Sequence, residues 1–116
     1  MNLNPVFMEL ENELGYPVEQ DMYQGREEIY GVFAYTDETG ALYGDNRAIE
    51  DTAYMRIRIY TPKNYNYMDL KHRTRNWLEK KGFCITGIRT WLESKINDDA
   101  QKIRCTVIDM TYTDTH

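Results

Sequence analysis

The sequence has only two cysteines, three prolines and two histidines among 116 residues. Cys84 and Cys105 are too few for a disulfide framework and lack the paired spacing of a zinc site, so we expect two reduced thiols. No stretch approaches the roughly 18 consecutive apolar residues that span a bilayer, and the first residues lack the basic and apolar parts of a signal peptide. These absences predict a soluble protein that is made in the cytosol.

Basic charge is also scarce, since 14 Lys and Arg residues stand against 19 Asp and Glu residues, giving a net charge of -5. A protein that tracks phosphates normally shows a basic face or a high pI, whereas here the two signs are interleaved. Nucleic-acid binding is therefore disfavoured. An acidic surface aids solubility, and it would also keep DNA from adhering to a passage that it lined. The sequence leaves both interpretations open.

The hydrophobic content of 41% and the aromatic content of 13%, with ten tyrosines, predict a folded chain. No internal repeat, linker or low-complexity tract divides it. We therefore expect a single domain over residues 1–116, long enough to bury one core without a metal or a disulfide.

The first half of the chain contains signals for one helix and two strands. Asn4 as a cap and Pro5 in the first turn predict a short helix over residues 5–14, closed by Gly15. β-Branched and aromatic residues predict strands over residues 28–35 and 52–60, the second with clean alternation. Residues 36–51 hold scattered glycines and an Asp-Asn pair, which predict a long exposed loop.

The second half contains signals for the longer helix and a hairpin. Helical spacing over residues 67–81 ends at Gly82, and Phe83 should contact Leu78 across that end. Residues 83–93 and 102–113 should pair antiparallel about a loop, with Arg104 near Trp91. The fold class that follows is α+β: a mainly antiparallel sheet of four to five strands, with the short N-terminal helix and the longer helix packed on one face.

No pattern for catalysis, cofactor binding or metal binding is present. His72 lies on the polar side of the longer helix without a carboxylate or nucleophile as partner, so a solvated histidine is expected. A phosphate-binding glycine loop, a zinc signature and an exposed-serine elbow are missing. The basic run at residues 71–75, with Lys80 and Lys81 and with Trp77 as a stacking platform, is a candidate nucleic-acid patch. Glu79 interrupts its charge, and Trp77 fits the core stripe of the helix better. We expect a protein that is not an enzyme and needs no cofactor.

Loop aromatics and methionines are the better candidate site, because such residues are enriched where proteins meet. Chance exposure is the alternative. Arg56 and Arg58 lie beside Tyr54 and Tyr60 on the outer face of the second strand, and such a face can pack against a neighbouring copy. The candidate interface residues, which share a position in or beside a predicted loop, are Met22, Tyr23, Tyr43, Asp45, Tyr65 and Tyr67.

Several segments resemble small tail proteins of siphophages and of prophages in Gram-positive bacteria. The similar segments are residues 15–23 (GYPVEQDMY), 42–46 (LYGDN) and 60–67 (YTPKNYNY), and Lys81-Gly82-Phe83 before a long hairpin. The resemblance covers residues 10–113. It rests on the order of these segments and on their local sequence similarity, and it includes no catalytic signature. The family it suggests is that of tail-completion or tail-terminator proteins.

The resemblance implies a virion structural protein that caps the head-proximal end of the tail tube and joins tail to capsid. It implies a ring of identical copies, typically a hexamer, that contacts the major tail tube protein and head-tail connector proteins and lets DNA pass without sequence-specific binding. The location would be the virion tail, and the host cytoplasm during assembly. Residues 19–27 and 36–51 are the expected docking loops. The alternatives are a head-side connector component and a cytoplasmic binding or regulatory protein of a prophage.

Overall fold

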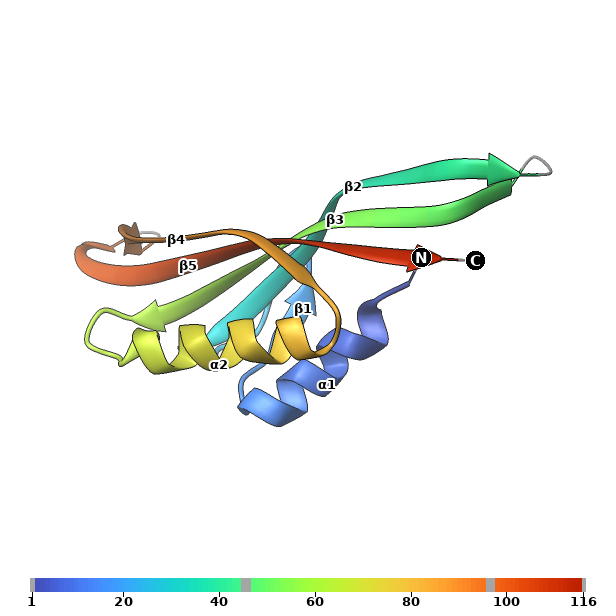
Figure 1. The fold of residues 1–116 in the computed structure, drawn as a ribbon. Coiled ribbons are helices and arrows are strands. Elements are labelled where there is room, and N and C mark those ends of the chain that lie inside the picture. The colour runs from blue at the N-terminus through green and yellow to red at the C-terminus, as the bar shows by residue number, and fades with distance from the viewer. Residues whose placement is uncertain (1, 45–46, 96–97, 116) are drawn as a thin grey trace.

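The computed structural model describes residues 2–44, 47–95 and 98–115. These residues form an α+β fold of two helices and a five-stranded sheet, which confirms the predicted fold class (Figure 1). The elements in chain order are α1 (Asn4–Leu14), β1 (Val18–Gln20), β2 (Tyr30–Gly44), β3 (Arg47–Pro62), α2 (Tyr67–Lys80), β4 (Cys84–Lys95) and β5 (Asp98–Thr115).

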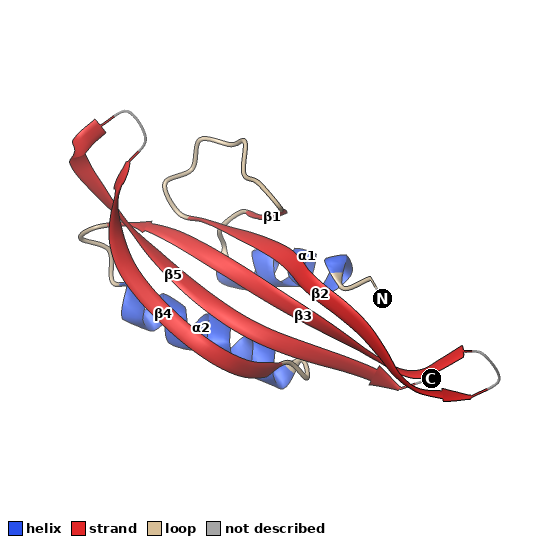
Figure 2. Ribbon diagram, turned by 90° about the horizontal axis from the view of Figure 1, so that it is seen from above, coloured by secondary structure: helices blue, strands red, loops and turns tan. Residues whose placement is uncertain are grey.

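The strands lie in the order β1-β2-β3-β5-β4. The short β1 pairs parallel with β2, and every other neighbouring pair is antiparallel. Both helices lie on the same face of the sheet, α1 below β2 and α2 toward β4 (Figures 1 and 2). No helix of the described residues covers the opposite face.

The core lies between the helices and the sheet. Phe7 of α1 is fully buried; its ring stacks on Phe33 of β2 with a centroid distance of 4.2 Å and meets Phe83 edge-on at 5.8 Å. The alternation in β3 turns Ala53, Met55, Ile57 and Ile59 into this core, as the sequence predicts. Hydrophobic burial is therefore concentrated on one side of the sheet.

The caps of the helices agree with those predicted from the sequence, except at Asn4. The N–H of Phe83 donates to the carbonyl of Leu78 at 3.0 Å and Gly82 has a φ of 100°, which confirms the predicted close of α2. The predicted cap at Asn4 is wrong, because Leu3 occupies that position. The Asn4 side chain instead accepts a hydrogen bond from the Tyr35 hydroxyl at 3.1 Å and so joins α1 to β2.

The predicted loop over residues 36–51 is wrong. β2 and β3 continue as a paired hairpin, with Gly40 opposite Asp51 and Tyr43 opposite Ala48. The pairing of β3 with β5 ends at Glu50, so the last part of the hairpin is a two-stranded ribbon. A ribbon without a core on either face imposes no apolar alternation, which is why the sequence lacks the usual strand signal here.

The register predicted between β4 and β5 is wrong by one residue, since Trp91 lies opposite Cys105 and Arg104 lies opposite Leu92. Pairing also continues through Lys95 and Asp98, so the predicted loop over residues 94–101 is too long. A shift in register between Ser94 and Lys95 separates this turn from the rest of the ladder. The predicted length of the loop between β4 and β5 therefore did not determine their register. A slip of one residue turns each side chain of a strand to the opposite face of the sheet.

The β2–β3 hairpin gives the molecule its elongated shape of 57 × 26 × 23 Å. The radius of gyration is 15.8 Å, against about 13 Å expected for a compact chain of this length. Thr36 forms a bulge between Tyr35 and Asp37, and its hydroxyl donates to the carbonyl of Tyr54 at 3.0 Å. Bulges bend and twist a strand. Beyond it, the hairpin arm, defined as residues 37–44 and 47–54, extends away from the helices (Figure 1).

Candidate functional site

The face of the sheet opposite the helices, the open face, is the candidate site. Its side chains follow from the register: residues paired across the strands share a face. One row of the open face runs Tyr30, Tyr60, Cys105 and Trp91 from β2 to β4. The next two rows along the strands are Val32, Arg58, Val107, Arg89 and then Ala34, Arg56, Asp109, Gly87.

The first row is largely aromatic and continues past the edge of β2. Tyr30 stacks on Tyr60 with a centroid distance of 4.9 Å, and Tyr23, from the loop after β1, stacks on Tyr30 at 4.3 Å. At the other end, the indole N–H of Trp91 donates to the Glu93 carboxylate at 3.0 Å. Tyrosine and tryptophan supply large, rigid contact areas at protein interfaces. This aromatic row therefore suits contact with another protein.

Gly25 sets the position of Tyr23. The Tyr23 hydroxyl accepts a hydrogen bond from the backbone N–H of Glu27 at 2.9 Å, so the ring lies across its own loop. A Cβ atom at Gly25 would overlap the end of that ring. The small residue at position 25 thus permits the stack on Tyr30.

We expect Gly25→Ala to displace Tyr23 from Tyr30 while changing the free energy of unfolding by less than about 1 kcal/mol, since the site is exposed. The displacement would appear by NMR as reduced ring-current shifts of the Tyr30 ring protons. Gly87→Ala is the matched control, because an added Cβ there meets no atom within 4 Å. Unchanged Tyr30 shifts in Gly25→Ala would show that the ring does not depend on Gly25.

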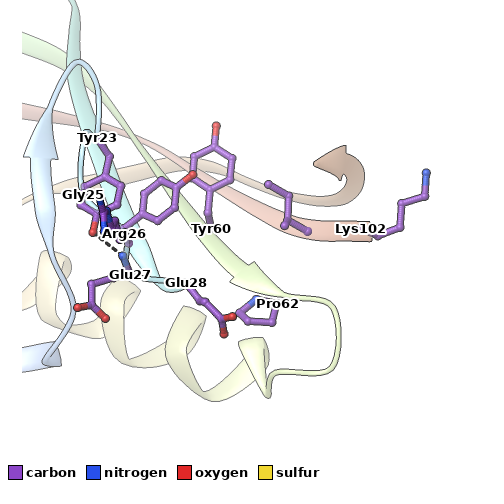
Figure 3. Close-up of a pocket in the computed structure, with 10 residues that line it drawn as sticks. Tyr23, Gly25, Arg26, Glu27, Glu28, Tyr60, Pro62 and Lys102 are labelled. Carbon is purple, nitrogen blue, oxygen red and sulfur yellow. Dashed lines mark hydrogen bonds between the residues drawn. The ribbon is translucent and has the colours of Figure 1, made fainter. Parts of the chain in front are cut away.

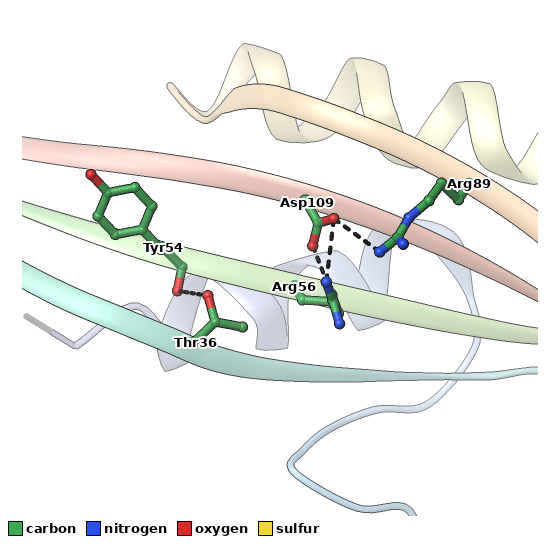
Figure 4. A network of polar contacts seen from close by, with 5 residues as sticks. All are labelled: Thr36, Tyr54, Arg56, Arg89 and Asp109. Carbon is green, nitrogen blue, oxygen red and sulfur yellow. Dashed lines mark hydrogen bonds and ion pairs between the residues drawn. The ribbon is translucent and has the colours of Figure 1, made fainter.

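Two arginines from neighbouring rows, Arg56 of the third row and Arg89 of the second, share the carboxylate of Asp109 (Figure 4). Arg56 Nε donates to Asp109 Oδ1 at 2.7 Å, and Arg89 Nη2 lies 3.4 Å from Asp109 Oδ2. Ion pairs of this partly exposed kind add about 1 kcal/mol or less to stability. Their main effect is to hold two guanidinium groups in place on the open face. Arginine is enriched, with tyrosine and tryptophan, among residues that dominate binding energy.

Small apolar side chains lie beneath the larger ones. Cys105 and Val107 are each only 1% exposed although no helix covers them, because neighbouring side chains such as Tyr60 and Arg58 flank them across the strands. Burial raises the pKa of the Tyr60 hydroxyl to about 12 and also raises the pKa of the Cys105 thiol. Both groups are therefore neutral at physiological pH, and Cys105 is not a thiolate nucleophile.

The loop of residues 21–29 separates two hollows. The first, about 420 Å³, borders the aromatic row (Figure 3), and the second, about 840 Å³, lies toward the end of α1. Arg26, Glu27, Glu28 and Pro62 line both hollows. The first is also lined by Tyr23, Gly25, Tyr30, Tyr60, Lys102 and Ile103. Their mixed charges and open form suit a protein surface better than a small-molecule site.

The candidate interface residues do not form one cluster. Tyr23 joins the aromatic row and Met22 beside it is exposed, whereas Tyr65 lines the second hollow. Tyr67 begins α2 and packs under the Arg104 guanidinium, 4.3 Å from its ring centroid. The two remaining candidates lie elsewhere: Tyr43 is on β2 opposite Ala48, and Asp45 lies outside the described residues.

Sequence reasoning did not assign Tyr30, Asp109 or Trp91 to the site. Tyr30 and Trp91 fall inside predicted strands, and only the register places them in one row with Tyr60. Asp109 joins the arginines for the same reason. The alternation of Tyr54, Arg56, Arg58 and Tyr60 in β3 was the available signal, and it indicated the correct face.

The described part of the chain offers neither a metal cluster nor a membrane-spanning helix. No group of three or more His, Cys, Asp or Glu side chains there is placed to hold a metal ion. Cys84 and Cys105 are both free thiols. His72 is exposed on α2. No described helix has the length and apolar character needed to cross a membrane.

No protein-family model matches this sequence, and no curated protein matches it significantly. The resemblance to tail-completion proteins therefore remains a prediction from the segments that carry it.

Proposed function

We propose that this chain is a structural subunit of a phage or prophage tail, of the tail-completion type, that assembles with its own copies into a ring at the head-tail junction. In this role it contacts the major tail tube protein and the head-tail connector proteins and performs no catalysis. The protein is made in the host cytoplasm and becomes part of the virion.

The observation that carries the proposal is the open face, where tyrosine, tryptophan and arginine side chains gather on a rigid sheet. Such residues dominate protein interfaces. Because Tyr23, Tyr30 and Tyr60 already stack on one another, a partner would not have to order them, which lowers the entropic cost of association.

The shape and charge of the chain support the same role. An arm that extends from a compact body can reach a neighbouring subunit, and interfaces between different patches of identical copies generate rings when the rotation closes. The net charge of -5 disfavours adhesion of DNA to such a ring. The similar segments at residues 15–23, 42–46 and 60–67 add the family-level support.

Native mass spectrometry of the purified protein over a hundredfold concentration range tests the assembly. We expect a closed ring of about six copies to form as concentration rises, because interfaces between identical copies are concentration-dependent. Proteomic analysis of purified particles provides the second measurement, and the protein should be present in them.

A monomer at every concentration, together with absence from purified particles, would contradict the proposal. That result would favour the cytoplasmic binding or regulatory role. A ring found on capsids that lack tails would instead favour a head-side connector component. Native mass spectrometry, proteomics of purified particles and the analysis of tailless capsids together separate the three roles.

A further inference from the structure

The sheet ends in two strand edges that have no partner among the described residues. β4 is the last strand on one side. On the other side, β1 covers β2 only from Gly31 to Phe33, so the outer edge of β2 is unpaired from Ala34 onward (Figure 2). Unpaired edges present free N–H and C=O groups that can pair with another chain.

The edge of β4 carries little protection against such pairing. Natural proteins protect edges with prolines, lysines or bulges. Between Gly87 and Ser94, β4 has no proline, no lysine and no shift in register. It also exposes two large apolar side chains, Trp91 and Leu92, on opposite faces of the strand. This segment has the features of an edge that is covered in an assembly.

The free edge of β2 has the strand direction needed to pair antiparallel with the edge of β4. β2 and β5 run the same way, and β3 and β4 run the opposite way. Within one copy, Ala34 of β2 lies level with Gly87 of β4. A second copy in the same orientation, displaced along the strands, therefore brings the free part of its β2 antiparallel to β4 of the first copy. Antiparallel pairing continues the alternation of the sheet across the boundary between the two copies.

The charges of the two sides are complementary. Residues 37–54, which include the arm, contain five acidic residues and one arginine, whereas residues 67–95, which include α2 and β4, contain seven basic and three acidic residues. Asp37 and Glu38 are exposed on the arm, and Arg89 is exposed on β4. Since α2 lies on the β4 side of the sheet (Figure 2), the segments on that side have a net positive charge and the arm has a net negative charge.

We propose that the partner of the β4 edge is a second copy of this chain, which adds the free edge of its β2 arm as the next strand. The inference rests on the proposed function, because it names the contact that builds the ring. Each copy uses β4 on one side and the arm on the other, which is the head-to-tail arrangement that closes into rings. Main-chain hydrogen bonds hold the strands together, and the opposite charges select the orientation.

Native mass spectrometry combined with hydrogen exchange tests the contact. The variant is Leu92→Lys, which places a lysine on the edge. Its matched control is Met68→Lys on α2, because Leu92 is 42% exposed and Met68 is 41% exposed. We expect Leu92→Lys to raise the concentration needed for assembly at least about tenfold, and Met68→Lys to leave it unchanged. In the wild-type assembly, amides of residues 37–44 and 87–94 should exchange more slowly than in the diluted monomer.

The outcomes separate this contact from ring assembly itself. A ring whose β4 amides exchange as fast as in the monomer, or a Leu92→Lys protein that assembles like the wild type, overturns the edge contact and leaves the ring intact. A wild-type protein that stays monomeric overturns both the contact and the ring. Loss of assembly in Met68→Lys as well would also overturn the contact. A lysine outside the β4 edge would then disrupt assembly as much as one on that edge.

Discussion

Replacement of Phe7 by alanine is expected to lower the free energy of unfolding by about 3–5 kcal/mol. Phe7 is 0% exposed and is the ring through which α1 contacts both Phe33 and Phe83. Truncation removes that apolar area and leaves a cavity between helix and sheet. Urea denaturation followed by circular dichroism measures the change, as a shift in midpoint at constant m-value.

Met8→Ala is the control for the same helix. Met8 is 66% exposed, so its truncation should change stability by no more than about 0.5 kcal/mol. Equal losses in Phe7→Ala and Met8→Ala would mean that α1 is held by something other than the packing of Phe7.

Above pH 10 we expect the protein to lose stability because Tyr16 stays protonated in the folded state. Burial raises the pKa of Tyr16 from 10.0 to about 12, and its O–H donates to Thr74 Oγ1 at 3.3 Å, while the Thr74 hydroxyl donates to Leu70. The unfolded chain releases this proton first, so stability is complete below pH 10 and falls between about pH 10 and 12. A shift of this size corresponds to about 2–3 kcal/mol.

Urea denaturation at pH 9 and pH 11.5, in wild type and Tyr16→Phe, isolates this contribution from that of the other titrating groups. The variant should lose about 1 kcal/mol at pH 9 with its hydrogen bond, and lose less than the wild type on going to pH 11.5. Absorbance at 295 nm should show fewer tyrosines titrating near pH 12 in the variant. An identical loss with pH in both proteins would place the alkaline sensitivity elsewhere.

The sequence predicted those parts of the fold that depend on local chemistry or on one buried face. The alternation of β3 and the close of α2 at Gly82 and Phe83 are two such parts, and both are confirmed. The outer part of the arm was missed because it is a two-stranded ribbon beyond the end of the β3–β5 pairing at Glu50, and its sequence carries no apolar period. The register of β4 was missed because a shift near its turn leaves no mark in the sequence.

The site was predictable only in part, for a related reason. Alternation in β3 places Arg56 and Arg58 on one face, but their partners come from strands distant in sequence. Asp109 lies opposite Arg56 only through the β3–β5 register, and Tyr23 reaches Tyr30 only because its loop folds back with a glycine at position 25. Long-range pairing, more than residue type, therefore assembles the open face.

The one-sided core has a consequence for how this protein can diverge. The helices cover one face of the sheet, so residues such as Phe7 and Ile57 are constrained by folding. Outward side chains such as Arg56 and Trp91 on the open face contribute little to that core. Mutation can therefore alter which partner is recognised while the scaffold stays the same, and the two properties can evolve at separate rates.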